Sequence, residues 1–163
     1  MGGAVLGRKK LRTFGAGLGL AVLAGPLVAE SQSFADWTVE CEEARCVAGQ
    51  TLSAPDQTWL GTLQLLPGEE GTVLVMRLPL GVHLGSGLFI SDGRTTLYPA
   101  TFTTCEAEGC RAVLPMSEEM VAGWRAGQSA EIRYRPASDT GVLAFEASLL
   151  GVTRALAALE ETQ

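Results

Sequence analysis

The chain has 163 residues, of which 18 are acidic, 12 are basic and 47% are hydrophobic. This length suits one domain, and the apolar content is sufficient for a buried core without a structural metal. From residue 30 onward there are 8 basic and 18 acidic residues, a net charge of −10, and arginine is the only basic type apart from one histidine. Such a surface repels nucleic acid and anionic lipid, which argues against nucleic-acid binding and is compatible with a cationic partner.

Residues 1–29 have the composition of a secretory signal peptide. A basic cluster at 8–12 is followed by an uncharged apolar run, Phe14–Val28, and then by the small residue Ala29. The run has 15 residues, whereas a membrane-spanning helix needs about 20. We therefore expect export, with cleavage close to Ala29.

Two alternatives to this cleavage stay open on the sequence. The cut could fall further along, near Ser31 or Ala35, or the segment could persist as an N-terminal anchor. On the main interpretation the mature protein is a single domain, residues 30–163, without a stable membrane span. It would lie in the periplasm, or be secreted to the outer envelope.

The first half of this domain has the alternation of half-buried strands. Apolar residues alternate with polar ones along Phe34–Cys41, and a polar turn leads to a partner strand, Cys46–Leu52. Trp59, Gly61, Leu63 and Leu65 fall on one face of a third strand, and Trp59 is expected in the core. The continuously apolar segment Val73–Leu78 indicates a central strand, and Pro79 after it marks a bulge or an edge.

The second half contains more strands and two helices. The dipeptide Asp92-Gly93 predicts a hairpin between the strands Leu84–Ser91 and Thr95–Tyr98. Helical spacing, Ser117 as N-cap and Gly127 as stop predict a short helix over Glu118–Ala126. The other predicted elements are the hairpin strands Phe102–Cys105 and Cys110–Leu114, the strands Ala130–Arg135 and Val142–Leu150, and a terminal helix, Thr153–Glu160. This succession of short strands, with no βαβ rhythm, predicts an all-β antiparallel sandwich with one or two short helices.

Four cysteines, Cys41, Cys46, Cys105 and Cys110, lie in the predicted mature part. In an oxidising compartment they are expected to form two disulfides, for which three connectivities are possible. We favour Cys41–Cys46 and Cys105–Cys110, because the four intervening residues can turn a hairpin and bring the two Cα atoms to about 5.5 Å. A zinc site is disfavoured because structural zinc sites use tighter cysteine spacings.

The sequence predicts no catalytic, cofactor-binding or metal-binding residue. The only histidine, His83, lies in the stretch Arg77–Arg94, which we expect to form the core through Leu78 and Ile90. A nucleophilic system needs an activated partner and an orienting acid, and no G-x-S-x-G motif is present. We interpret His83 as structural or solvent-facing. The acidic doublets fall in predicted turns and at helix ends, where they are usually solvated, and no calcium-binding loop motif occurs.

Several short motifs follow one another in a fixed order along the chain. They are Trp37-x3-Cys41, Cys46-x3-Gln50, Arg77-Leu78-Pro79-Leu80-Gly81-Val82, Asp92-Gly93, Cys105-x3-Gly109-Cys110 and the terminal segment Ala147–Leu159. In this order they resemble the invasion-associated locus B (IalB) family of exported alphaproteobacterial proteins. The resemblance implies an immunoglobulin-like β-sandwich in the periplasm or outer envelope. It brings no catalytic residues, and although founding members are linked to invasion of erythrocytes, many relatives belong to free-living bacteria.

Three functions are consistent with this sequence. The first is a non-catalytic interaction protein, virulence-associated in some relatives, whose protein partner lies in the envelope or on a host surface. The second is a periplasmic accessory of envelope stress or assembly. The third is a hydrolase that uses two carboxylates. A flat exposed apolar patch would favour the first two, and a deep pocket lined by two acids would favour the third.

Overall fold

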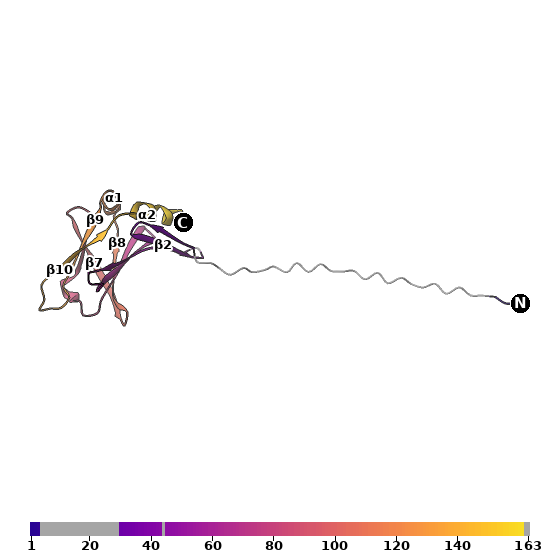
Figure 1. Cartoon of the computed structure of the whole chain (residues 1–163), viewed down its shortest axis with the longest axis horizontal. Helices are drawn as coiled ribbons and strands as arrows, with labels where there is room; N and C mark the ends of the chain where they lie inside the picture. Colours follow the sequence, from indigo (N-terminus) through magenta and orange to yellow (C-terminus); the bar gives the residue numbers. More distant parts are fainter. Residues whose placement is uncertain (4–29, 44, 162–163) are drawn as a thin grey trace.

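The computed structural model describes residues 1–3, 30–43 and 45–161, so nearly all of the predicted signal peptide lies outside the described residues (Figure 1). Strands predominate, with two α-helices and one 3-10 turn. In chain order the elements are β1 (Glu30–Phe34), β2 (Trp37–Glu42), β3 (Arg45–Ser53), β4 (Trp59–Gly68), β5 (Gly71–Leu78), η1 (Leu84–Ser86), β6 (Leu88–Ser91), β7 (Leu97–Glu106), β8 (Gly109–Pro115), α1 (Glu118–Ala126), β9 (Ser129–Tyr134), β10 (Leu143–Ser148) and α2 (Val152–Glu160).

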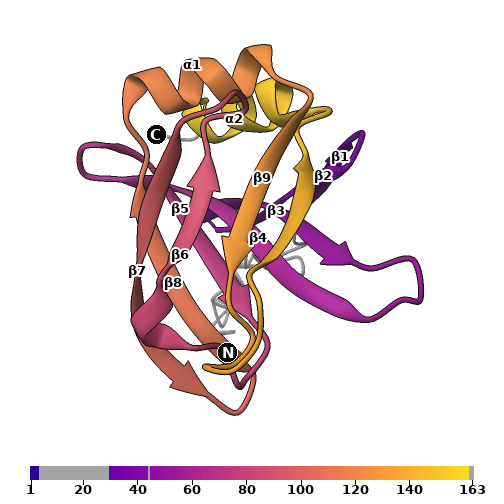
Figure 2. The same ribbon diagram turned by 90° about the vertical axis from the view of Figure 1, so that its left-hand side faces the viewer.

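The ten strands are joined in one antiparallel sheet of order β1-β2-β3-β4-β5-β8-β7-β6-β9-β10. The strand β7 pairs with β6 through its first residues, Leu97–Ala100, and with β8 from Thr101 onward. The sheet changes direction along this strand, so that β6, β9 and β10 lie in front of β3 and β4 in Figure 2. The predicted all-β, antiparallel fold with two short helices is confirmed. The hydrogen bonds describe one continuous curled sheet, and the immunoglobulin-like sandwich stays an expectation from the family resemblance.

Both helices lie together at one end of the curled sheet (Figures 1 and 2). The predicted bounds of α1 are confirmed, and the hydroxyl of Ser117 accepts a hydrogen bond from the Met120 backbone N–H at 3.2 Å. This N-cap satisfies one of the free N–H groups of the first turn. The second helix, α2, buries Val152, Ala155, Leu156 and Leu159 on the face toward the sheet.

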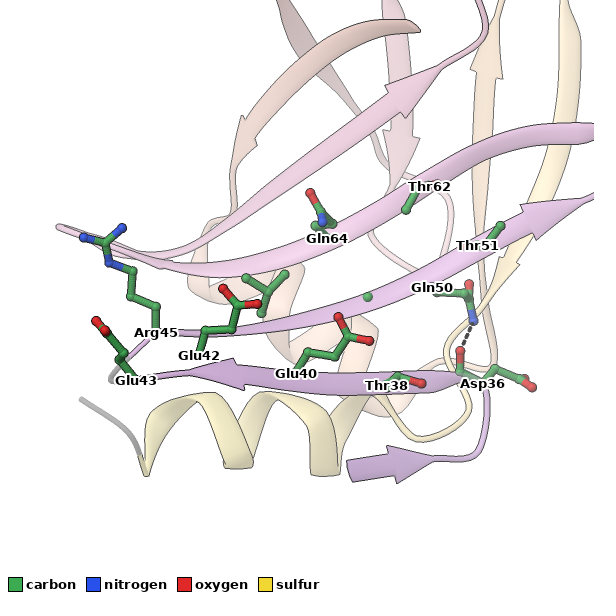
Figure 3. Close-up of a pocket in the computed structure, with 12 residues that line it drawn as sticks. Asp36, Thr38, Glu40, Glu42, Glu43, Arg45, Gln50, Thr51, Thr62 and Gln64 are labelled. Carbon is green, nitrogen blue, oxygen red and sulfur yellow. Dashed lines mark hydrogen bonds between the residues drawn. The ribbon is translucent and has the colours of Figure 1, made fainter. Parts of the chain in front are cut away.

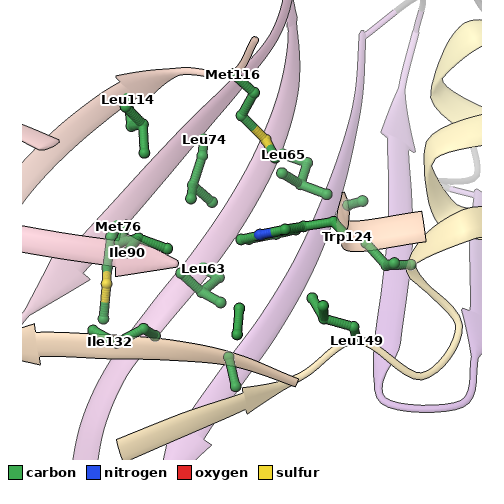
Figure 4. Close-up of a cluster of buried hydrophobic side chains, with 14 of the residues drawn as sticks. Leu63, Leu65, Leu74, Met76, Ile90, Leu114, Met116, Trp124, Ile132 and Leu149 are labelled. Atoms are coloured by element: carbon green, nitrogen blue, oxygen red, sulfur yellow. The ribbon is translucent and has the colours of Figure 1, made fainter. Parts of the chain in front are cut away.

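The core lies between the two arms of the sheet and beneath the helices. Trp124 of α1 reaches in among Leu63 and Leu65 of β4, as Figure 4 shows, and its ring centroid lies 6.1 Å from that of Trp37. Leu78 and Ile90 are fully buried, as predicted. The prediction that β5 is central is also confirmed, because Leu74, Val75 and Met76 are buried in succession.

Three details differ from the sequence prediction. Residues 84–91 do not form one strand, because η1 occupies 84–86 and Gly87 has a positive φ of 76° before β6 begins. The strands predicted at 95–98 and 102–105 are one strand, β7, since the intervening residues also pair. Trp59 is half-buried rather than in the core, and its indole N–H donates to Thr62 Oγ1 on the same strand.

An additional strand was not predicted from the sequence. The polar residues of β1 show no apolar alternation, and their pairing with β2 is a backbone ladder from Glu30 opposite Cys41 to Phe34 opposite Trp37. A tight turn at Ala35 and Asp36 joins these two strands. Side-chain periodicity cannot detect a strand whose side chains are almost all exposed.

Candidate interaction surfaces

His83 is positioned by the loop between β5 and β6. Its backbone N–H donates to Arg135 O at 2.9 Å, and its Nδ1 lies 2.7 Å from Ser86 Oγ. The ring is partly exposed, and its partner belongs to the adjacent 3-10 turn. This arrangement stabilises a loop and has no carboxylate orienting the imidazole, so it lacks the geometry of a nucleophilic triad. The structural interpretation of His83 agrees with this geometry, although the side-chain hydrogen bond to Ser86 was not foreseen.

The acidic side chains of the N-terminal strands line an open groove on the outer face of β2, β3 and β4 (Figure 3). Glu40 and Glu42 project from β2, next to Arg45 on β3, and Thr62 and Gln64 of β4 form the opposite wall. The four carboxylates of this groove, those of Asp36, Glu40, Glu42 and Glu43, are solvent-exposed. A hydrolytic carboxyl pair requires one acid in a desolvated environment, which this open groove does not provide.

Gln50, one of the motif residues, lies in the lining of this groove and also holds two parts of the sheet together. It is buried, and its Nε2 donates to the carbonyl oxygens of Asp36 and Ser148, both at 3.2 Å. Trp37 Nε1 donates to the same Ser148 oxygen at 3.0 Å. These bonds attach the end of β10 to β2 and β3, which belong to the other arm of the sheet. The hydrogen bonds of Trp37 and Gln50 therefore give both motif residues a role in holding the fold together.

The Asp92-Gly93 motif is also explained by packing. Asp92 is buried, and its Oδ1 accepts hydrogen bonds from the backbone N–H groups of Arg94 and Thr96. The preceding residue, Ser91, accepts from Trp124 Nε1 at its carbonyl and from the Glu131 N–H at its hydroxyl, both at 2.8 Å. One turn thus joins β6, α1 and β9.

A second groove, more apolar than the first, lies on the outer face of β6, β9 and β10. Its lining combines Phe89 of β6 with Val142 and Ala144, beside Arg133 and Arg135. Phe89 and Val142 are 37% and 60% exposed, which is high for large apolar side chains. Leu80 and Leu84, on the nearby loop that bonds to Arg135, are also exposed. Phe89 and Val142 therefore give this groove an exposed apolar surface.

This second groove could not be located from the sequence. Its lining comes from segments about 50 residues apart in the chain, and it was not among the predicted site residues. The available signals were Phe89, which falls out of phase with the buried Leu88 and Ile90, and Val142 at the end of a loop. Both positions lie within predicted strands, Leu84–Ser91 and Val142–Leu150, but periodicity does not reveal which neighbours cover a side chain.

The structure brings the predicted cysteine pairs to disulfide distance. The sulfur atoms of Cys41 and Cys46 lie 2.01 Å apart, and those of Cys105 and Cys110 lie 2.07 Å apart. Each pair lies directly across the end of a hairpin, β2–β3 in one case and β7–β8 in the other. The Cα atoms are 4.1 and 4.0 Å apart, so both pairs fit the local connectivity.

Within the described ranges, 1–3, 30–43 and 45–161, no cluster of three or more His, Cys, Asp or Glu side chains could hold a metal ion. Over the same part of the chain, no helix has the length and apolar character needed to cross a membrane.

Comparison with known proteins shows which protein family this chain belongs to. It matches the family described as invasion associated locus B (IalB) protein over residues 37–160. Two invasion protein B homologs of Brucella abortus, from strain 2308 and from biovar 1 strain 9-941, are each 29% identical over 145 residues, covering 83% of this chain and 82% of theirs. A crystal structure of invasion associated protein B from Bartonella henselae superposes with a TM-score of 0.73 at 17% identity, covering 82% of this chain and 97% of that one. The family match spans most of the sequence, and the chain belongs to the invasion-associated locus B family.

Proposed function

We propose that this protein is exported to the bacterial envelope and acts there by binding another protein rather than by catalysing a reaction. The observation that carries the proposal is the groove on β6, β9 and β10, where exposed apolar side chains gather beside two arginines. Clustered exposed apolar surface on a soluble domain usually marks an interaction site. The acidic groove, in contrast, is open and its carboxylates are solvated, which does not favour the hydrolase alternative.

Three observations support export. The chain begins with a basic segment and an apolar run typical of a signal peptide. Both cysteine pairs are at disulfide distance, and disulfides persist in oxidising compartments such as the periplasm. The relatives from Brucella and Bartonella are named for invasion. For this chain we propose a protein partner in its own envelope, and an invasion role would require a host-surface partner in addition.

The test is capture of partners from the periplasm of the bacterium that makes the protein, followed by mass spectrometry. The wild type is compared with a Phe89→Ser/Val142→Ser variant, which removes the two exposed apolar groups of the groove. Leu150→Ser is the matched control, because Leu150 is 54% exposed and lies outside the groove. We expect a protein that is captured by the wild type and the control and is lost with the groove variant. Equal capture by all three would place the contact elsewhere, and recovery of the protein only from the cytoplasm would contradict export.

A further inference from the structure

The strand β10 is one edge of the described sheet. The residues whose backbone groups face its unpaired side can be identified from the hydrogen bonds of the strand. Leu143, Phe145 and Ala147 stand opposite Tyr134, Ile132 and Ala130 of β9, and the Leu149 N–H donates to Gln128 O on that same side. The Ser148 carbonyl points the other way, because it accepts from Trp37 and Gln50. In a strand the backbone groups of alternate residues point to opposite sides. Ala144 and Glu146 therefore present their N–H and C=O groups to the open edge.

The charges on the outer face of this edge are poorly matched within one molecule. Glu146 stands directly opposite Glu131 in the β9–β10 ladder, whereas Arg133 stands opposite the small, uncharged Ala144. Like charges in directly opposed positions destabilise a sheet. Arg133 is paired with Glu131 along β9, which leaves the carboxylate of Glu146 without a cation in its own ladder.

The inner face of the same edge is apolar and incompletely covered. Leu143 and Phe145 are half-buried, and the Phe145 ring makes an edge-on contact with Tyr134, with 6.0 Å between the ring centroids. An open edge with an apolar face readily pairs with another strand.

We propose that the edge of β10 pairs with β10 of a second copy of this chain, antiparallel about a two-fold axis. In the register that we propose, Ala144 of one copy stands opposite Glu146 of the other, and Phe145 stands opposite its own counterpart on the axis. Arg133 then extends across Ala144 toward the unpaired Glu146 of the second copy, and the same contact forms twice. The register that places Glu146 opposite Glu146 is disfavoured by repulsion, and a slip by one residue would exchange the two faces.

A second copy fits this edge better than an arbitrary strand for two reasons. The arrangement is self-complementary, since Arg133 of each copy supplies a cation to Glu146 of the other, and closed two-fold contacts are the commonest form of self-association. The contact also brings two Phe145 rings together, and cross-strand aromatic pairs stabilise sheets. The edge of β10 shares Arg133 and Ala144 with the lining of the groove, but this inference does not require the partner proposed for the groove.

Sedimentation equilibrium of the protein purified from the periplasm tests the inference. The wild type is expected to be a dimer at the higher concentrations. Ala144→Pro removes an N–H that faces the open edge, not β9, and should leave a folded monomer, as thermal melting would check. The control Ala144→Val keeps that N–H and should still dimerise. A wild type that is monomeric at every concentration, or equal dimerisation of the two variants, would overturn the proposal.

A charge exchange gives a second test that leaves the backbone unchanged. Glu146→Arg and Arg133→Glu should each weaken dimerisation by about tenfold or more, since two contacts change sign in every dimer. The double variant restores opposite charges across the axis and should recover most of the affinity. Additive losses in the double variant would contradict the proposed register.

Discussion

At the scale of single residues, the contact between Gly123 and Asp92 shows how closely α1 approaches the turn after β6. A Cβ atom placed on Gly123 would lie 2.2 Å from the carbonyl oxygen of Asp92. The next residue, Trp124, donates its indole N–H to Ser91 O at 2.8 Å. The glycine therefore allows the helix to approach the turn until this buried hydrogen bond can form. Hydrogen bonds within the turn and at the end of α1 hold both backbone segments in place, so neither can move away freely.

We predict that Gly123→Ala destabilises the protein, although alanine is the better helix former by about 1 kcal/mol. Overpacking against a fixed backbone oxygen typically costs about 1–3 kcal/mol, so after the helix gain is subtracted we expect a net loss of up to about 2 kcal/mol in the free energy of unfolding. Denaturant titration measures the change. Gly141→Ala is the control, since a Cβ there meets no atom within 4 Å, and it should have almost no effect. A Gly123→Ala protein as stable as the control would show that α1 can move away from the turn.

At the scale of elements, each cysteine pair closes a hairpin whose two strands already pair through their backbones. Cys41 stands opposite Cys46 in the β2–β3 ladder, and Cys105 stands opposite Cys110 in the β7–β8 ladder. One member of each pair, Cys46 and Cys110, is buried. The two hairpins belong to different parts of the sheet, separated in strand order by β4 and β5.

We predict that replacing Cys41 and Cys46 together by alanine lowers the free energy of unfolding by roughly 2 kcal/mol. The estimate follows from the short loop, whose closure restricts the unfolded chain only modestly, and the second pair has the same sequence separation of 5. The matching Cys105/Cys110 double variant should therefore lose a similar amount, which denaturant titration of the three proteins would measure. Non-reducing peptide mapping checks the connectivity, and a crosslink between the two motifs would contradict it.

At the scale of the whole molecule, the start of β1 bears on where the signal peptide is removed. The strand begins at Glu30, directly after the predicted cut, and pairs with β2 along its full length. Its end contacts α2, because the Arg154 guanidinium lies 5.3 Å from the centre of the Phe34 ring. In the turn that follows, the Asp36 N–H donates to Leu150 O, between β10 and α2. A cut near Ala35 would remove β1 and separate this turn from its strand.

We predict that the exported protein begins at Glu30, because this cut preserves all of β1. Intact-mass measurement of periplasmic protein should show the loss of residues 1–29, with the cysteines oxidised. Blocking the cut with Ala29→Pro should retain the precursor in the membrane fraction and provides the control. A mature protein that begins at Ala35 or later and melts like one that begins at Glu30 would show that β1 contributes little. A full-length mass for the wild type in the membrane fraction would instead support the anchor alternative.

The sequence alone determined the features that depend on neighbouring residues. The bounds of α1 followed from an N-cap, a helical apolar face and a stop, and the structure reproduces Glu118–Ala126. The local cysteine pairs followed from hairpin spacing, and the burial of Leu78 and Ile90 followed from their apolar surroundings. The order of family motifs was also present in the sequence, and the family match confirms it.

Which strands pair, and which apolar residues stay uncovered, depend on packing between distant parts of the chain. The neighbours β5–β8 and β6–β9 are far apart in the chain, and their pairing depends on competition among many strands with similar patterns. Trp59 has the residue type of a core position, yet it stays half-buried because its strand begins at the margin of the sheet. The groove around Phe89 and the open edge at Ala144 and Glu146 arise in the same way. Burial depends on what packs from elsewhere in the chain, whereas periodicity reports only the side to which a residue points.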